Sequence, residues 1–125
     1  MKRAMPYLAA ALFIIAAGLH YLPIEATSRG PIDFVVGVYE SENQPVAEVS
    51  VLEGSTANAI RKAGKWRQYD KDQIPGAYKP KFDPIIAKQG IPCLILVRGG
   101  SVVYSGKLPA TNEDLAALIQ KQGGY

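Results

Sequence analysis

The hydrophobic and polar positions divide the chain into an apolar N-terminal stretch and a longer region of short, alternating elements. Two basic residues, Lys2 and Arg3, precede residues 4–22, which are apolar at all but a few positions. This pattern is typical of a secretory signal or of a single membrane anchor. Residues 5–24 reach the length of about 20 residues that a spanning helix needs, whereas the apolar part of a cleaved signal has roughly 7–15.

Residues 1–24 are therefore expected to form an uncleaved signal anchor, a transmembrane helix that crosses the membrane with residues 5–24. Ala16-Ala17-Gly18 fits the small-x-small rule for cleavage, so secretion after signal cleavage is the alternative. Lys2 and Arg3 keep the N-terminus in the cytoplasm, which would place the domain in the periplasm or outside the cell. Residues 25–31 are polar with Gly and Pro and indicate a linker, which leaves residues 32–125 as the domain.

The first half of this domain predicts two strands and a helix. Residues 32–39 are β-branched, aromatic and almost continuously apolar, as in a strand buried on both faces of a sheet. The Asn-Gln-Pro sequence at 43–45 suits a helix start, with either polar residue as its N-cap, and apolar residues recur at helical spacing until Gly64. Residues 65–69 indicate a second short strand, and residues 70–80 a loop.

The second half predicts a helix, a hairpin and a final helix. Glycines in the turn at residues 98–101 tolerate the positive φ that a tight hairpin requires, and Thr111 with Asp114 resembles a capping box before an amphipathic helix. The order β-α-β-α-β-β-α predicts an α/β fold with a central mixed β-sheet flanked by helices. The predicted elements are a helix that opens with Asp83 as N-cap and Pro84 and ends at residue 88 or 89, strands at 94–97 and 102–104, and a helix after Thr111.

Chemistry in the domain is limited by its composition. The only histidine, His20, lies in the apolar stretch, and the only cysteine is Cys93. A Ser-His-Asp triad, a Cys-His pair, a zinc site of the usual ligands and an intramolecular disulfide are therefore excluded for residues 32–125. Asp70-Lys71-Asp72 lacks the further oxygen ligands of a calcium loop, with Ile74 where a ligand would be needed. We expect no metal and no cofactor.

Basic residues gather in one segment of an otherwise mildly charged domain. Lys2, Arg3 and Glu25 lie in the first 26 residues, so the net charge of +3 becomes +2 for the rest, too little to argue for nucleic acid as a partner. Residues 61–88 carry eight basic and three acidic residues, interleaved with Trp66, Tyr69, Tyr78 and Phe82. Such a segment could bind anionic lipid head groups or an acidic protein partner, and a solvated face is the plainer interpretation.

Residues 90–102, with the sequence GIPCLILVRGGSV, resemble the second half of a thioredoxin fold, in which a Gly-Ile-Pro motif precedes an apolar strand, a basic-Gly turn and a second strand. Gly106 and the final helix continue the resemblance, which covers residues 83–122. The pattern WRxxDxD at 66–72 is also similar to redox-inactive thioredoxin-like proteins of bacteria and their phages. The resemblance implies a three-layer thioredoxin-like sandwich with a cis Ile91–Pro92 peptide bond at the edge of a substrate groove.

The chain lacks the Cys-x-x-Cys pair that thioredoxins carry where the first strand turns into the first helix. That turn is here residues 39–45, which contain no cysteine, and Glu40 and Glu42 would raise the pKa of a thiol placed there. Dithiol–disulfide exchange within one molecule is therefore excluded. The expected function is that of a membrane-tethered, redox-inactive thioredoxin-like domain acting as a protein-binding or scaffolding module. Its expected groove residues are Ser41, Glu42, Asn43, Gln44, Ile91, Pro92 and Cys93.

Cys93 leaves two interpretations. It follows Pro92 at the start of a strand, in the slot where thioredoxins carry Thr, and free cysteine is among the most buried residue types, which favours a core side chain. The alternative is a thiol-dependent oxidoreductase with Cys93 as its single reactive thiol, or an intermolecular disulfide dimer. The absence of a histidine and of a resolving cysteine argues against an enzyme. Asp33 resembles the buried acid of thioredoxins, but has no dithiol to serve and is expected to be structural or to lie at the strand edge.

Overall fold

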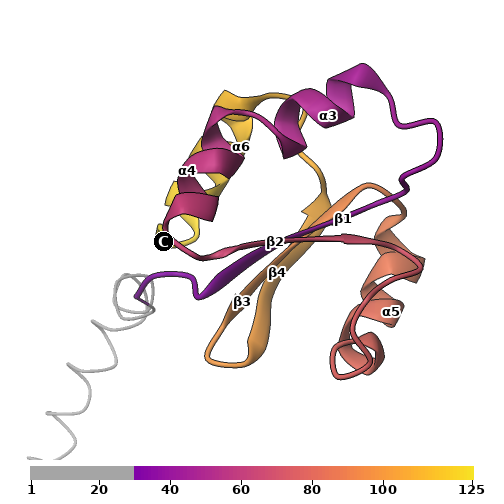
Figure 1. Ribbon diagram of the computed structural model, residues 1–125. Coiled ribbons are helices and arrows are strands. Elements are labelled where there is room, and N and C mark those ends of the chain that lie inside the picture. Colours follow the sequence, from indigo (N-terminus) through magenta and orange to yellow (C-terminus); the bar gives the residue numbers. More distant parts are fainter. Residues whose placement is uncertain (1–29) are drawn as a thin grey trace, which may run out of the picture. The chain divides into compact units, whose positions relative to one another are not determined.

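The computed structural model describes residues 30–125, in which four strands and four helices form one unit over Pro31–Tyr125 (Figure 1). The expected anchor at residues 1–24 and most of the expected linker lie outside the described residues. Among those described, no helix is long and apolar enough to cross a membrane. The elements in chain order are β1 (Phe34–Tyr39), α3 (Val46–Leu52), α4 (Ser55–Lys62), β2 (Trp66–Asp70), α5 (Lys79–Gln89), β3 (Cys93–Arg98), β4 (Ser101–Lys107) and α6 (Asn112–Lys121).

The strands form one mixed sheet in the order β2-β1-β3-β4. β1 pairs with β2 in parallel and with β3 in antiparallel, so that both of its hydrogen-bonding edges are occupied. Its residues 35–38 are buried, as the continuous apolar run predicted. The predicted α/β class, with a central mixed sheet flanked by helices, is confirmed, and the arrangement is compatible with a thioredoxin-like fold.

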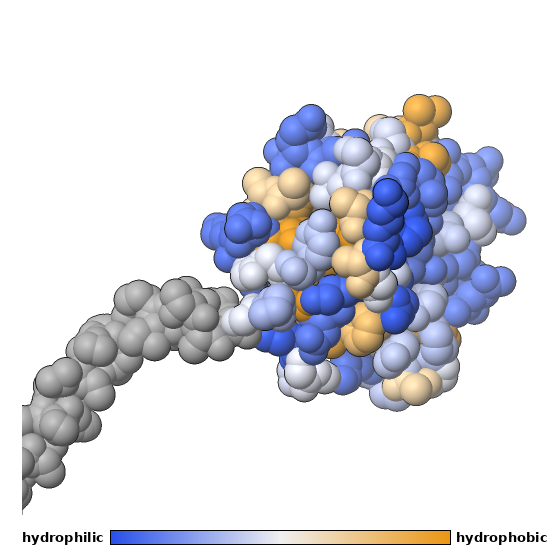
Figure 2. Space-filling model, turned by 60° about the vertical axis from the view of Figure 1, so that its left-hand side comes forward, coloured by the Kyte–Doolittle hydropathy of each residue, from blue (hydrophilic) through white to orange (hydrophobic). Residues whose placement is uncertain are grey.

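Helices cover the two faces of the sheet unequally (Figure 1). On one face, α3, α4 and α6 bury a core that includes Trp66 of β2 and Leu94 of β3. On the other face, α5 packs through Phe82 against Val36, Cys93 and neighbouring apolar residues of the strands. Seen from the side turned forward in Figure 2, the surface is mostly hydrophilic, and apolar side chains reach it only in small separate patches.

The single helix predicted up to Gly64 is wrong, because the structure has two helices that separate at Glu53 and Gly54. A Cβ on Gly54 would overlap the side-chain oxygen of Asn112 and the backbone oxygen of Ser50. Because Gly54 has no side chain, α6 can approach this closely at the point where the two helices separate. Asn43 and Gln44 do not cap the first helix either, since α3 begins at Val46 with Pro45 as its N-cap residue.

The helix predicted to open at Asp83 begins earlier, at Lys79, and contains Pro84. Pro80 lies in its first turn, where a proline removes no hydrogen bond that the helix needs. Asp83 therefore does not cap the helix, and its carboxylate pairs with Lys79 at 3.6 Å. By contrast, the predicted cap of the last helix is confirmed, because the Thr111 side chain accepts a hydrogen bond from the backbone N–H of Asp114.

The hairpin between β3 and β4 turns at Gly99 and Gly100, whose φ angles are 61° and 79°. Two consecutive residues in this left-handed region define the tight turn that the glycines predicted. Asp33, which precedes β1, is exposed, and its carboxylate accepts a hydrogen bond of 2.7 Å from the Gly99 N–H. Asp33 thus lies immediately before β1 and holds the β3–β4 turn in place.

Candidate functional site

The segments that contain the predicted groove residues meet at one end of the sheet, along the edge formed by the C-terminal ends of β1 and β2 and the N-terminal end of β3. The register pairs Val38 of β1 with Cys93 of β3, and Tyr39 with Asp70 of β2. The Ser41–Gln44 turn therefore leaves β1 at the edge where Ile91 and Pro92 enter β3 and where β2 ends. The Ile91–Pro92 peptide bond at this edge is cis.

Asp70, the last residue of β2, binds the Ser41–Gln44 turn. Its carboxylate accepts hydrogen bonds from the backbone N–H of Ser41 at 3.0 Å and from that of Asp72 at 2.8 Å. Hydrogen bonding from the Ser41 side chain, and then from the backbone N–H groups of Asp72 and Ser41, holds the pKa of Asp70 below its ordinary value of 3.8, and nearby Lys71 acts in the same direction. Asp70 is also buried, at 9% exposure. Its carboxylate holds the backbone at Ser41 and at Asp72 in place through these hydrogen bonds.

Three carboxylates gather around this position, with a lysine among them. Oxygen atoms of Glu40, Asp70 and Asp72 lie within 4.8 Å of one another. The Lys71 Nζ lies 3.4 Å from Glu40 Oε1 and 3.1 Å from Asp72 Oδ2. Hydrogen bonds to Asp72 and Glu40 raise the pKa of Lys71. The ammonium group supplies the positive charge that this cluster needs, so the cluster gives no ground for assigning a metal.

The turn itself exposes its side chains. Ser41, Glu42 and Asn43 are exposed, and Asn43 has a φ of 54°, in the left-handed region that asparagine tolerates better than most residues. Directly beyond the turn, the first turn of α3 leaves Val46 at 84% and Val49 at 37% exposure. Two apolar side chains thus face solvent next to the predicted groove, a feature that the helical periodicity alone did not reveal.

Across this edge from the Ser41–Gln44 turn, the backbone groups without a partner belong to Ile91. The Pro92 carbonyl accepts a hydrogen bond from Leu108 N–H at 3.3 Å. Neither the N–H nor the C=O of Ile91 makes a hydrogen bond to another residue of the described part of the chain. Ile91 is only partly buried, and its two backbone groups have no backbone partner among the described residues.

Cys93 does not line the groove as a solvent-accessible thiol. It is fully buried, and its side chain packs with Val36, Val38 and Ile95 in the layer beneath α5. Burial raises the pKa of its thiol to about 11, which makes the thiolate scarce at neutral pH. This geometry agrees with the interpretation of Cys93 as a core residue.

The basic and aromatic residues of segment 61–88 separate onto different parts of the surface. Arg61 lies over the ring of Trp66, at 5.8 Å from its centre, on the face covered by α4. Arg67 lies over the ring of Phe34, at 4.5 Å, on the face covered by α5. One stretch of sequence therefore does not form one basic surface.

Comparison with known proteins leaves the chain without a family assignment, because no protein-family model and no curated protein matches it. The α/β class therefore rests on the structure.

The role of Asp70 predicts that an Asp70→Asn variant loses folding stability in a pH-dependent way. Since the pKa of Asp70 is lower in the folded than in the unfolded chain, its stabilising effect is complete above the unfolded value near 3.8 and is lost as the pH falls through the folded value. The urea midpoint of Asp70→Asn should lie below that of the natural protein at pH 7, and the gap should close below pH 3.8. Asp72→Asn, which removes an exposed carboxylate, is the control. A gap of equal size at both pH values would contradict this role.

Buried Cys93 predicts slow reaction of the native protein with iodoacetamide at pH 7 and complete reaction in urea. Cys93→Ser should lose on the order of 1–3 kcal/mol of stability by burying a hydroxyl group, and Cys93→Ala should lose less because it adds no polar group. Between pH 9 and 11 the unfolded chain releases the thiol proton before the folded chain does, so the stability advantage over Cys93→Ala should decrease as the pH rises. Rapid native labelling would contradict the core assignment.

Proposed function

We propose that the chain is a membrane-tethered, thioredoxin-like domain without redox activity that binds an extended segment of a protein partner. The binding edge consists of the Ser41–Gln44 turn and of Ile91 and Pro92. The element order β-α-α-β-α-β-β-α, the mixed sheet and the sequence resemblance of residues 90–102 support the thioredoxin-like assignment.

The observation that carries the proposal is the free backbone of Ile91 beside a turn without a thiol. An extended peptide can pair with backbone N–H and C=O groups that have no partner within the domain, so that main-chain hydrogen bonds supply affinity and neighbouring side chains supply specificity. Ile91 provides both backbone groups. The exposed side chains of the turn, Glu42 and Asn43 among them, are placed to distinguish partners.

Exposed apolar side chains next to the turn give such a segment a surface to bury. Val46 is almost completely exposed and Val49 partly so, and a bound segment that covered them would gain about 0.8 kcal/mol for each methylene group buried. The alternative of a thiol-dependent oxidoreductase has less support, because full burial keeps Cys93 from substrates and the pKa shift keeps it protonated.

The proposed tether predicts the location of the domain. An alkaline phosphatase fused after Gly30 should be active, since this enzyme folds only outside the cytoplasm, and it should stay with membranes after a carbonate wash. Release of an active fusion from the membrane would indicate the cleaved signal instead. An inactive fusion would contradict both the tether and its orientation.

The binding edge can be tested by photocrosslinking in the full-length chain. A photoreactive residue at exposed Glu42 should crosslink a discrete protein in membranes of the native cell, and Cys93→Ala should leave this product unchanged. The matched position is exposed Lys121, at the opposite end of the sheet, where the carbonyl of neighbouring Gln122 accepts a hydrogen bond from Arg98.

Two results would contradict the proposal. Equal crosslinking from Glu42 and Lys121 would remove the evidence for a specific edge. Insulin reduction by the purified chain that disappears in Cys93→Ala would favour the thiol enzyme, because a buried thiol should not react with a protein disulfide.

A further inference from the structure

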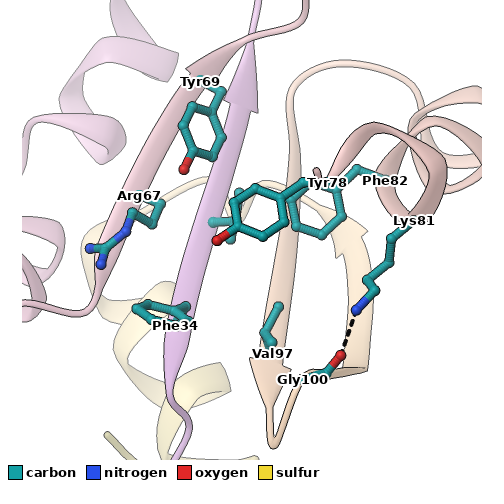
Figure 3. A pocket seen from close by; sticks show the side chains of 9 residues that line it. Phe34, Arg67, Tyr69, Tyr78, Lys81, Phe82, Val97 and Gly100 are labelled. Atoms are coloured by element: carbon teal, nitrogen blue, oxygen red, sulfur yellow. Dashed lines mark hydrogen bonds between the residues drawn. The ribbon is translucent and has the colours of Figure 1, made fainter. Parts of the chain in front are cut away.

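A cleft on the α5 face of the sheet is formed by residues other than those of the binding edge. It lies between α5, the β3–β4 turn and strands β1 and β2, and has a volume of about 170 Å³ (Figure 3). Phe34 and Tyr69 line it from the sheet, and Tyr78 and Phe82 line it from α5. An apolar cavity of about 150 Å³ holds a molecule of benzene, so the cleft has room for one aromatic ring.

The cleft exists because α5 covers only part of this face. Tyr78 and Phe82 stack with their ring centres 5.5 Å apart, and Phe82 fills the space toward the core. Tyr78 remains 43% exposed at the rim. Phe34 lies beyond the reach of the helix and presents its ring between the sheet and Arg67. An inserted aromatic side chain would therefore meet aromatic surface on both sides, which is favourable beyond the area it buries.

Arg67 is held at one side of this cleft without a carboxylate partner. Its Nη1 donates hydrogen bonds of 3.2 Å to the carbonyl oxygens of Gly64 and Trp66, and its guanidinium carbon lies 4.5 Å from the centre of the Phe34 ring. Figure 3 shows the hydroxyl groups of Tyr69 and Tyr78 directed toward the side of the cleft where Arg67 lies. Three groups that can donate hydrogen bonds thus surround the place where an anionic group would be bound.

Lys81 supplies a second cation on the other side of the Tyr78 ring (Figure 3). Its Nζ donates a hydrogen bond of 2.5 Å to the carbonyl oxygen of Gly100, which ties α5 to the β3–β4 turn. Among the described residues, no carboxylate pairs with Lys81 or Arg67, whereas Arg61, Lys71 and Lys79 of the same segment have such partners. Arg61 pairs with Glu53, and Lys79 pairs with Asp83.

We propose that this cleft binds an acidic segment of a partner protein by taking up one aromatic side chain, with carboxylates on either side of it facing Arg67 and Lys81. A peptide fits better than a lipid, because the space for one ring does not accept an acyl chain and because the two cations lie on opposite sides of the ring site. Arginine and lysine bind carboxylates through charge-assisted hydrogen bonds, and arginine can do so with two at once. The proposal is independent of the proposed function, since the residues that line the cleft are not those of the binding edge.

Isothermal titration of the full-length chain in a nonionic detergent tests the proposal with the peptide acetyl-Gly-Asp-Phe-Asp-Gly-amide. Binding should be lost when the peptide's phenylalanine is replaced by alanine, and it should weaken when its aspartates are replaced by asparagines or when salt is raised. Arg67→Gln should weaken binding roughly tenfold, the size expected for one hydrogen bond to a charged group. Tyr78→Ala should weaken it by a similar factor.

The matched control is Lys88→Gln, which makes the same charge change at an exposed position of α5 outside the cleft and should alter binding less than about twofold, as a screened surface charge does. Should Arg67→Gln fail to fold, as judged by circular dichroism, Lys81→Gln on the exposed side of α5 replaces it with the same expectation. Crosslinking at Glu42 in the Arg67→Gln variant tests whether the cleft and the binding edge act separately. The crosslinked product should remain, because the substitution lies outside the binding edge.

Four outcomes would overturn the proposal. The first is no binding of the peptide at millimolar concentration, and the second is equal binding by the natural chain and by folded Arg67→Gln. The third is competition by glycerol 3-phosphate as effective as that by the peptide, which would assign the cleft to lipid head groups. The fourth is binding of phenylacetate as tight as that of the peptide, which would assign it to a small aromatic acid.

Discussion

The central strand β1 has no free edge and no free face, and the other features of the domain follow from this constraint. Its hydrogen-bonding groups pair with β2 on one side and with β3 on the other, and its side chains enter both layers of the core. A strand in this position must be apolar along its length, so it leaves room for polar chemistry only where it ends. The same constraint buries Cys93, because it stands opposite Val38 in the register.

The two layers beside this strand differ in how completely they are filled. On the face of α3, α4 and α6, the absence of a side chain at Gly37 leaves space for Trp66 and Leu52, since a Cβ there would lie 3.0 Å from Leu52 Cδ2. On the other face a single helix among those described, α5, covers the sheet. Close packing thus stabilises one layer, while the other combines a core beneath Phe82 with an open cleft near its edge.

Local patterns in the sequence predicted the parts of the fold that depend on neighbouring residues. The apolar run of β1, the Gly99-Gly100 turn and the Thr111 cap each rest on short-range chemistry. The division of the helix falls at Gly54, where Asn112 approaches from far along the chain, and a contact of this kind could not be read from helical spacing. The early start of α5 was missed because Pro80 indicates a loop unless it falls in a first helical turn.

In the candidate site, too, local sequence patterns predicted some residues but not the contacts between distant ones. The resemblance of residues 90–102 pointed to Ile91 and Pro92, and the missing cysteines pointed to a turn without redox chemistry. The sequence places Asp70 at the start of a loop, and local patterns cannot predict its hydrogen bond to Ser41, which joins positions 29 residues apart. The sequence also presents the basic residues of 61–88 as one group, whereas strand alternation sends Trp66 and Arg67 to opposite faces of the sheet.

Asp70 also determines how freely the turn after β1 can change. Its carboxylate fixes the turn from a neighbouring strand, through the backbone groups of Ser41 and Asp72 and through the Ser41 side chain. The side chains of Glu42 and Asn43 point to solvent, and of these two positions only the second carries a conformational restriction, because its positive φ favours Asn, Asp or Gly. The domain thereby separates support from recognition, as antibody frameworks do, and the turn is a position at which new binding sequences can be grafted without rebuilding the scaffold.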